Sequence, residues 1–91
     1  MILSLYFKLV FTTRTVYYNV DTEWTTSELY TNIAPLIFND FGIQNFELAD
    51  TYPPFNGKSE EKPKIEPSNN ITLEQLYSNK IKFIAIYIRP N

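Results

Sequence analysis

Residues 81–88 read IKFIAIYI. Apart from Lys82, apolar side chains occur at both odd and even positions of this run, so a strand here would be apolar on both of its faces. Strands of this kind usually lie inside a sheet, with a neighbour on each side. The run therefore predicts a central strand, and the rest of the sequence must supply the strands beside it and the layer that covers it.

The first twenty residues predict two further strands. Every second position of the first run is apolar, which would place these side chains on one face: Leu3, Leu5, Phe7, Leu9 and Phe11. A short polar tip at 12–14 follows. The next run also alternates, and it would put Val16, Tyr18 and Val20 on the face that the odd residues of the first run occupy. Together the two runs predict a β-hairpin.

A helix is predicted over residues 26–41. Residues 25–28 (TTSE) fit a capping box, in which Thr25 and Glu28 each accept a hydrogen bond from the other's backbone amide. Trp24 is placed to pack on Leu29 as a hydrophobic staple. Gly42 suits the left-handed residue that follows a helix. The apolar residues with helical spacing are Leu29, Ile33, Leu36, Ile37 and Phe41.

Pro35 conflicts with this helix. Proline removes one backbone donor and crowds the carbonyl four residues earlier, so we expect a kink or a break there.

The remaining segments give weaker signals. A short strand is predicted at 43–48, and one turn of helix at 72–76 (TLEQL). Residues 50–70 contain four of the six prolines and a charged run at 58–64, so we expect a long, mobile surface loop that gives the sheet nothing to bury. The order is strand, strand, helix, strand, short helix, strand. This order predicts one α+β domain over residues 1–91.

Composition limits the function. The chain has no cysteine and no histidine, which excludes disulfides, thiolate nucleophiles, imidazole bases and the usual zinc ligands. The candidate carboxylate pairs for acid–base chemistry are Glu60 with Glu61 or Asp40. Because the sequence indicates no nucleophile or pocket beside them, we interpret them as solvated charges. Only two glycines are present, so a phosphate-binding loop is not expected. We expect a protein that is not an enzyme and needs no cofactor.

Charge and hydropathy limit the partners. The net charge is −2 and the basic residues are scattered, whereas binding to nucleic acid usually needs a basic stripe. No run approaches the roughly 20 apolar residues of a membrane-spanning helix. Lys8 interrupts the apolar start of the chain and no small-residue cleavage site follows, so a strand is preferred to a signal peptide. We expect no direct nucleic-acid or membrane partner, and an intracellular protein of the cytoplasm or the nucleus.

The predicted elements follow one another in a defined order: the opening hairpin, the capped helix ending in Phe41-Gly42-Ile43, the turn at 72–76 and the last strand running into Arg89. Over nearly the whole chain this order resembles the ubiquitin-like β-grasp family. The resemblance implies a mixed sheet of four to five strands, with the first and last strands parallel at its centre and one helix packed across it. It also implies a core of Leu3, Leu5, Phe7, Val16, Tyr18, Val20, Leu29, Ile33, Ile37, Phe46, Leu73, Leu76, Ile84 and Ile86.

Two departures from the family's pattern narrow that resemblance. Conjugated members end in a Gly-Gly pair, whereas this chain ends in Arg89-Pro90-Asn91, so it resembles a non-conjugated member. Glu47 stands where ubiquitin has the exposed aliphatic residue of its third strand, so we do not expect ordinary ubiquitin receptors to bind it. Residues 10–13 and 85–91 are also similar to parts of the Sin3-associated eighteen-kilodalton polypeptide, a ubiquitin-like subunit of nuclear complexes.

The candidate site is the sheet face opposite the helix. If the odd residues of the first strand face the helix, the opposite face has an aromatic and mostly uncharged centre, and tyrosine is enriched in binding hot spots. We therefore predict a docking surface for a protein partner that consists of Tyr6, Lys8, Tyr17, Glu47, Phe83, Ala85 and Tyr87. The alternative is that these tyrosines only form cross-strand pairs or lie beneath a loop.

Other interpretations of the sequence remain open. Tyr30, Ala34 and Phe38 form an apolar helix flank, which either accepts a partner helix or is simply buried. The leading functional hypothesis is a protein-interaction module or a small subunit of a larger complex. The alternatives are a structural subunit that forms a homo-oligomer and, more remotely, a modifier or sulfur-carrier protein truncated before a Gly-Gly end.

Overall fold

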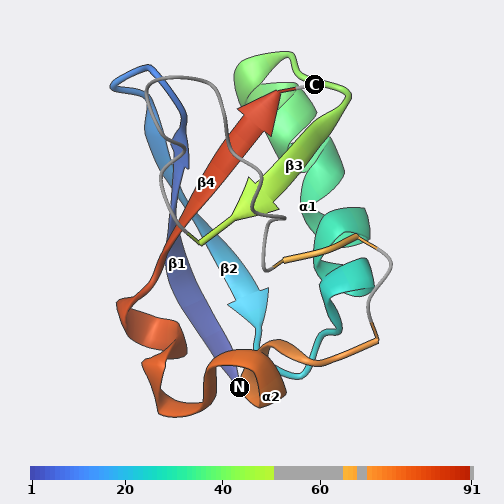
Figure 1. Ribbon diagram of the computed structural model, residues 1–91. Helices are drawn as coiled ribbons and strands as arrows, with labels where there is room; N and C mark the ends of the chain where they lie inside the picture. Colours follow the sequence, from blue (N-terminus) through green and yellow to red (C-terminus); the bar gives the residue numbers. More distant parts are fainter. Residues whose placement is uncertain (51–64, 68–69, 91) are drawn as a thin grey trace, which may run out of the picture.

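The computed structural model describes residues 1–50, 65–67 and 70–90. Within these residues the chain is α+β, with a four-stranded mixed sheet and the long helix α1 along one side of it (Figure 1). The elements are β1 (Ile2–Leu9), β2 (Thr15–Asp21), α1 (Thr26–Phe41), β3 (Phe46–Ala49), α2 (Leu73–Tyr77), a 3₁₀ helix η1 (Ser78–Phe83) and β4 (Ala85–Pro90). This arrangement is compatible with a β-grasp.

The sheet order is β2-β1-β4-β3, so the first and last strands lie at its centre. β1 is parallel to β4, with Phe7 opposite Ile86 and Leu9 opposite Ile88, and both outer pairs are antiparallel. In Figure 1, β1 and β4 run up the page while β2 and β3 run down. The central parallel pair agrees with the expected mixed sheet.

The core lies between the sheet and α1. The predicted residues that are fully or nearly fully buried are Leu5, Phe7, Tyr18, Val20, Leu29, Ile33, Ile37, Leu73 and Ile86. Leu3, Val16, Phe46 and Ile84 are half-buried and pack against this cluster. Five residues of this buried cluster were missing from the prediction: Leu9, Leu48, Ile65, Ile81 and Ile88.

Capping explains where α1 begins and ends. The Thr25 hydroxyl accepts from the Glu28 amide at 3.2 Å, and Glu28 accepts from the Thr25 amide at 3.2 Å, so the predicted capping box is confirmed. Gly42 has φ +72° and donates to the Phe38 carbonyl at 2.9 Å. The break expected at Pro35 is absent, because α1 is one continuous helix. Pro35 is exposed, so the carbonyl that lacks its donor can turn toward water.

The tip of the hairpin differs from the prediction. β1 ends at Leu9, and Phe11 is 63% exposed with φ +61° instead of continuing the core face. Val10 is buried in its place, and its amide donates to the Ile88 carbonyl at 3.1 Å. The Val10 amide still bonds to β4 as a strand residue would, and the chain reverses directly after it. Alternation alone does not locate that reversal.

The last strand is displaced from its predicted position. Residues 78–83 form η1, and β4 begins only at Ala85, whereas the sequence predicts a strand from 81. Ile81 lies in η1 and is buried in the core. Its carbonyl accepts a hydrogen bond from the Ile84 amide at 3.4 Å. An apolar residue just before a strand looks like part of the strand when only hydropathy is compared.

β3 and the segment after it also depart from the prediction. β3 spans Phe46–Ala49 instead of 43–48. Most of the segment expected to be a mobile loop, 51–64 and 68–69, lies outside the described residues. Ile65 contradicts the expectation that this segment buries nothing, because it is 0% exposed and forms an antiparallel bridge with Leu48.

α2 is tied to the turn before α1. Thr72 and Gln75 form a second capping box, which the sequence prediction missed. The amides of Leu73 and Glu74 donate to the carbonyls of Trp24 and Thr22 at 3.0 and 2.9 Å. These bonds join residues 49 and 52 positions apart in the sequence, at the end of the sheet where β1 begins.

The capping box leads to a stability prediction. Thr25→Ala removes the hydroxyl that accepts from the Glu28 amide, and it should lower the free energy of unfolding by about 1 kcal/mol. Urea denaturation followed by circular dichroism measures this change. Thr31→Ala is the control in the same helix, because the Thr31 hydroxyl only bonds back to the Ser27 carbonyl. Equal denaturation midpoints for the two variants would contradict the capping role.

Ile65 provides a second stability prediction. Ile65→Ala should cost about 2 to 5 kcal/mol, because it removes a fully buried side chain from the edge of the core. The neighbouring half-buried Glu66→Ala should stay within about 0.5 kcal/mol of wild type. Denaturant titration of both variants measures the difference. A silent Ile65→Ala would mean that this residue contributes nothing to the core.

Candidate docking surface

The sheet face opposite α1, called the back face below, is defined by the strand register. Tyr6 lies opposite Tyr17 on β2 and opposite Ala85 on β4, and Lys8 lies opposite Tyr87. Phe46 and Leu48 pack toward the core, so Glu47 and Ala49 alternate onto the back face. Six of the predicted residues therefore share this face: Tyr6, Lys8, Tyr17, Glu47, Ala85 and Tyr87.

The Phe83 backbone lies outside the strands that form the back face. It lies in η1, before β4 begins, so no strand register places this residue beside Ala85 and Tyr87. The sequence predicts a strand from 81, whereas β4 begins at Ala85.

Accessibility varies across the back face. Tyr17 is 67% exposed, whereas Tyr6, Lys8, Glu47, Ala85 and Tyr87 are half-buried. Ala49, beside Tyr87, is only 4% exposed. The accessible aromatic part of this face therefore lies on the β1–β2 side. There the rings of Tyr6 and Tyr17 meet edge to face, with centroids 5.5 Å apart and planes at 73°.

One exposed apolar residue of the back face was missed by the sequence prediction. Ile2 is 68% exposed and has the same parity on β1 as Tyr6. It lies opposite Asp21, and Ser4 lies between it and the tyrosine pair. Following the even positions of the strand back from Tyr6 through Ser4 would have found it.

Three other tyrosines have their hydroxyls engaged within the fold. The Tyr18 hydroxyl donates to the Asp40 carboxylate at 2.7 Å, and the Tyr77 hydroxyl donates to Asp50 at 3.3 Å. Burial raises the pKa of both phenols, and the neighbouring carboxylates raise each pKa further. Asp40, one of the carboxylates considered for acid–base chemistry, is thus a hydrogen-bond partner of β2. Glu60 and Glu61 lie outside the described residues.

Tyr30 joins the helix to the edge of the sheet. Its hydroxyl accepts from the Leu48 amide at 2.8 Å and donates to the Ile65 carbonyl at 2.6 Å. Its ring stacks on Phe46 with centroids 5.7 Å apart. Of the helix flank considered as a partner groove, Tyr30 is therefore used by the fold, Ala34 is half-buried, and Phe38 is 52% exposed.

The hairpin tip is attached to the end of α1. The Arg14 guanidinium donates to the Asp40 carbonyl and lies over the Phe41 ring, 4.7 Å from its centroid. A cation at a helix C-terminus is favourable because the last carbonyls carry partial negative charge. β2 is therefore held against α1 from Arg14 to Tyr18.

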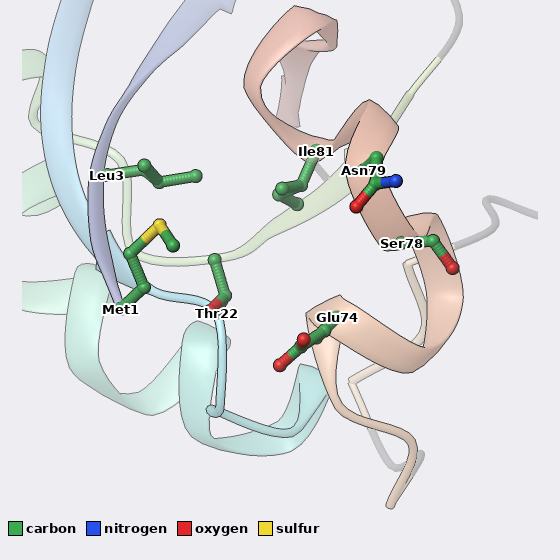
Figure 2. A pocket seen from close by; sticks show the side chains of 7 residues that line it. All are labelled: Met1, Leu3, Thr22, Glu74, Ser78, Asn79 and Ile81. Carbon is green, nitrogen blue, oxygen red and sulfur yellow. The ribbon is translucent and has the colours of Figure 1, made fainter.

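A second candidate region is a cavity of about 200 Å³ at the end of the sheet where β1 begins (Figure 2). Leu3 and Ile81 point toward one another across it, and Glu74 approaches from α2. Small-molecule sites usually enclose about 300 to 1,000 Å³, so this cavity is small for such a ligand. The described residues that line it are Met1, Leu3, Thr22, Glu74, Ser78, Asn79 and Ile81.

The chemistry of this cavity is limited. Glu74 is the one ionisable side chain among the described lining residues, and Ser78 has no imidazole near it because the chain has no histidine. A serine nucleophile needs an adjacent base. Over residues 1–50, 65–67 and 70–90 there is also no group of three or more acidic, histidine or cysteine side chains that could hold a metal ion. In the same part of the chain no helix is long and apolar enough to cross a membrane.

Comparison with known proteins adds no assignment to this geometry. Neither protein-family models, nor curated proteins, nor solved structures gave a match to the chain. The function must therefore be inferred from its own residues.

The position of Tyr30 predicts a pH dependence. Burial raises the pKa of its phenol from 10.0 to about 12. Below pH 10 the phenol is protonated in both the folded and the unfolded chain, so its contribution to stability is complete. Between about pH 10 and pH 12 the unfolded chain loses this proton first, and the free energy of unfolding should therefore fall as the pH rises.

Urea denaturation at a series of alkaline pH values measures this slope. Tyr30→Phe should lower stability at neutral pH, because the Leu48 amide and the Ile65 carbonyl lose their partner. It should also show a shallower fall above pH 10 than wild type. Identical slopes for the two proteins would show that Tyr30 does not titrate differently in the folded state.

Proposed function

We propose that this chain is a non-catalytic, ubiquitin-like protein-interaction module that binds a protein partner through the Tyr6–Tyr17 side of the back face. A ubiquitin-like assignment is supported by the opening hairpin, the parallel pair β1–β4 and the capped helix on one side of the sheet. Binding is favoured over catalysis because the described residues present a large aromatic surface on the open face of the sheet.

The observation that carries the proposal is the exposure of Tyr17. Tyr17 is 67% exposed and adjoins the Tyr6 ring, and contiguous exposed apolar patches on monomers are often functional. On the back face, Tyr6 lies opposite Tyr17 and Thr15 and Asn19 flank it along β2; these three are uncharged, and Lys8 lies diagonally from Tyr17, opposite Thr15. A partner can therefore cover this region without removing a charge from water, which would be costly.

The edge-to-face contact with Tyr6 adds to the suitability of Tyr17. Two rings that already restrain one another lose less rotational freedom when a partner covers them than isolated side chains do. Tyrosine also offers a large contact area and one polar atom, which is why it is common at interaction hot spots.

Charged residues lie at the margins of this surface. Glu47 and Arg89 share the back face on its β3 and β4 side, Lys8 lies on β1 between Thr15 and Tyr87, and Asp21 lies at the end of β2. Charges at a rim affect the rate of association and the orientation of the partner more than the final affinity. We therefore expect a partner with an apolar patch that is bordered by charges of both signs.

Substitution of Tyr17 tests the proposal. Tyr17→Ala should weaken binding by about 1 to 3 kcal/mol, the range for an aromatic anchor, and should change stability by about 0.5 kcal/mol or less. Partners captured by the immobilised protein from an extract of its source cells can be purified and titrated by calorimetry. Tyr87→Ala, on the half-buried side of the same face, is expected to act in the same direction.

Ile86→Ala is the matched control for Tyr87→Ala, because Ile86 is the preceding residue and points into the core with no exposed surface. It should cost about 2 to 5 kcal/mol of stability and leave the affinity of the folded fraction unchanged. If folded Tyr17→Ala and Tyr87→Ala both bind like wild type, the partner contacts another surface.

A further inference from the structure

The outer edge of β2 can be identified from two hydrogen bonds. The Thr22 amide donates to the Met1 carbonyl at 2.8 Å, and the Leu9 amide donates to the Arg14 carbonyl at 3.1 Å. Each bond joins an odd-numbered residue on the β1 side of the hairpin to an even-numbered residue on the β2 side. Hydrogen-bonded and non-hydrogen-bonded pairs alternate along an antiparallel ladder, so the even residues of β2 bond to β1. The odd residues of β2 direct their backbone groups away from β1.

Within the described part of the chain, three residues of β2 therefore present backbone groups that have no partner. The Asp21 carbonyl accepts from the Trp24 amide at 3.1 Å, which completes the edge at that end. Thr15, Tyr17 and Asn19 remain, and each offers one N–H and one C=O. All three are exposed, and over the described part of the chain β2 pairs with β1 alone.

This edge lacks the features that usually prevent strands from pairing between molecules. Proteins protect edge strands with lysine, proline, bulges or short length. β2 is seven residues long, contains neither lysine nor proline, and pairs with β1 in continuous register. Its one charged residue, Asp21, is at its end. The other edge of the sheet is different, because Ile65 forms a bridge with Leu48 there.

We propose that β2 pairs with β2 of a second copy of the chain, antiparallel and about a two-fold axis at Tyr17. Tyr17 then lies opposite its own symmetry mate, and Thr15 lies opposite Asn19 of the second copy in both directions. Each of these pairs exchanges two backbone hydrogen bonds, which uses all the free edge groups of the three residues. The two four-stranded sheets become one continuous sheet.

Charge and side-chain chemistry favour a second copy as the occupant. An antiparallel pair is destabilised when like charges lie directly opposite, and over residues 15–19 this register brings together only threonine, valine, tyrosine and asparagine, none of them charged. The net charge of −2 per chain gives little general repulsion between copies. The pairing also brings the Tyr6–Tyr17 pairs of the two copies onto the same face, so a bound partner would meet one surface across the axis.

Charge substitutions at the paired positions test both the edge and the register. In wild type, light scattering coupled to size-exclusion chromatography should show a monomer that converts to a dimer as concentration rises. Thr15→Lys with Asn19→Lys places like charges opposite one another twice per dimer and should weaken the dimer about tenfold or more. Thr15→Lys with Asn19→Glu places opposite charges there and should retain it. Both double variants carry Thr15→Lys, so any effect of that change within one chain is common to them.

Amide hydrogen exchange provides a readout that does not depend on the variants. In the wild-type dimer the amides of Thr15, Tyr17 and Asn19 should gain protection as concentration rises, whereas Tyr18, which already bonds to β1, should change little. Tyr87→Ala lies on β4 and should leave dimerisation unchanged, so a failure of the docking surface and a failure of self-pairing can be told apart.

Three results would overturn self-pairing. The first is a wild-type chain that stays monomeric at every concentration. The second is a dimer that both double variants weaken equally, which would place the interface elsewhere. The third is a monomer whose Thr15, Tyr17 and Asn19 amides become protected only when an extended segment of another protein is added, because a different strand would then occupy this edge.

Discussion

The parallel pairing of β1 with β4 is the constraint on which the rest of the structure depends. Two parallel strands cannot be joined by a tight turn, so the chain between them must cross from one end of the sheet to the other. In this chain that connection contains β2, α1, β3 and α2. Because both central strands bury Phe7, Ile86 and Ile88 on the same face, α1 must lie on that face and the opposite face remains available.

Once α1 lies across the sheet, polar contacts hold its ends. The Thr25 cap and the bonds from α2 to the Trp24 and Thr22 carbonyls fasten the N-terminal end. Arg14 and Tyr18 contact Asp40 at the C-terminal end. The net contribution of one hydrogen bond to the stability of a protein is only about 1 kcal/mol. These contacts therefore mainly determine where the helix lies, while burial of the core supplies most of the driving force for folding.

The tyrosines of the described residues divide into two groups by position. Tyr18 is buried, Tyr30 and Tyr77 are half-buried, and the hydroxyls of all three have partners in the fold. Tyr6, Tyr17 and Tyr87 share the back face, and Tyr17 is the most accessible of them. The proposed docking surface and the proposed pairing edge meet at this residue, since its ring lies on the back face and its backbone lies on the outer edge of β2. One residue would thus take part in two kinds of contact, which use different atoms.

The sequence by itself determined the features that depend on neighbouring residues. Alternation located the hairpin, the capping box located the start of α1, and Gly42 located its end, because strand periodicity, helix caps and left-handed backbone are local preferences. The back face followed from the same alternation, and so six of the seven predicted residues share it. The features that only the tertiary structure decided depend on segments far apart in the chain. Ile81 is buried in the core as part of η1, so β4 begins only after it. Ile65 is buried because Tyr30 and Leu48 bond to its backbone. No local pattern reports whether a distant partner will be there to cover an apolar side chain, which is why the start of β4 was misplaced and the exposure of Tyr17 relative to Tyr87 became known only from the packed sheet.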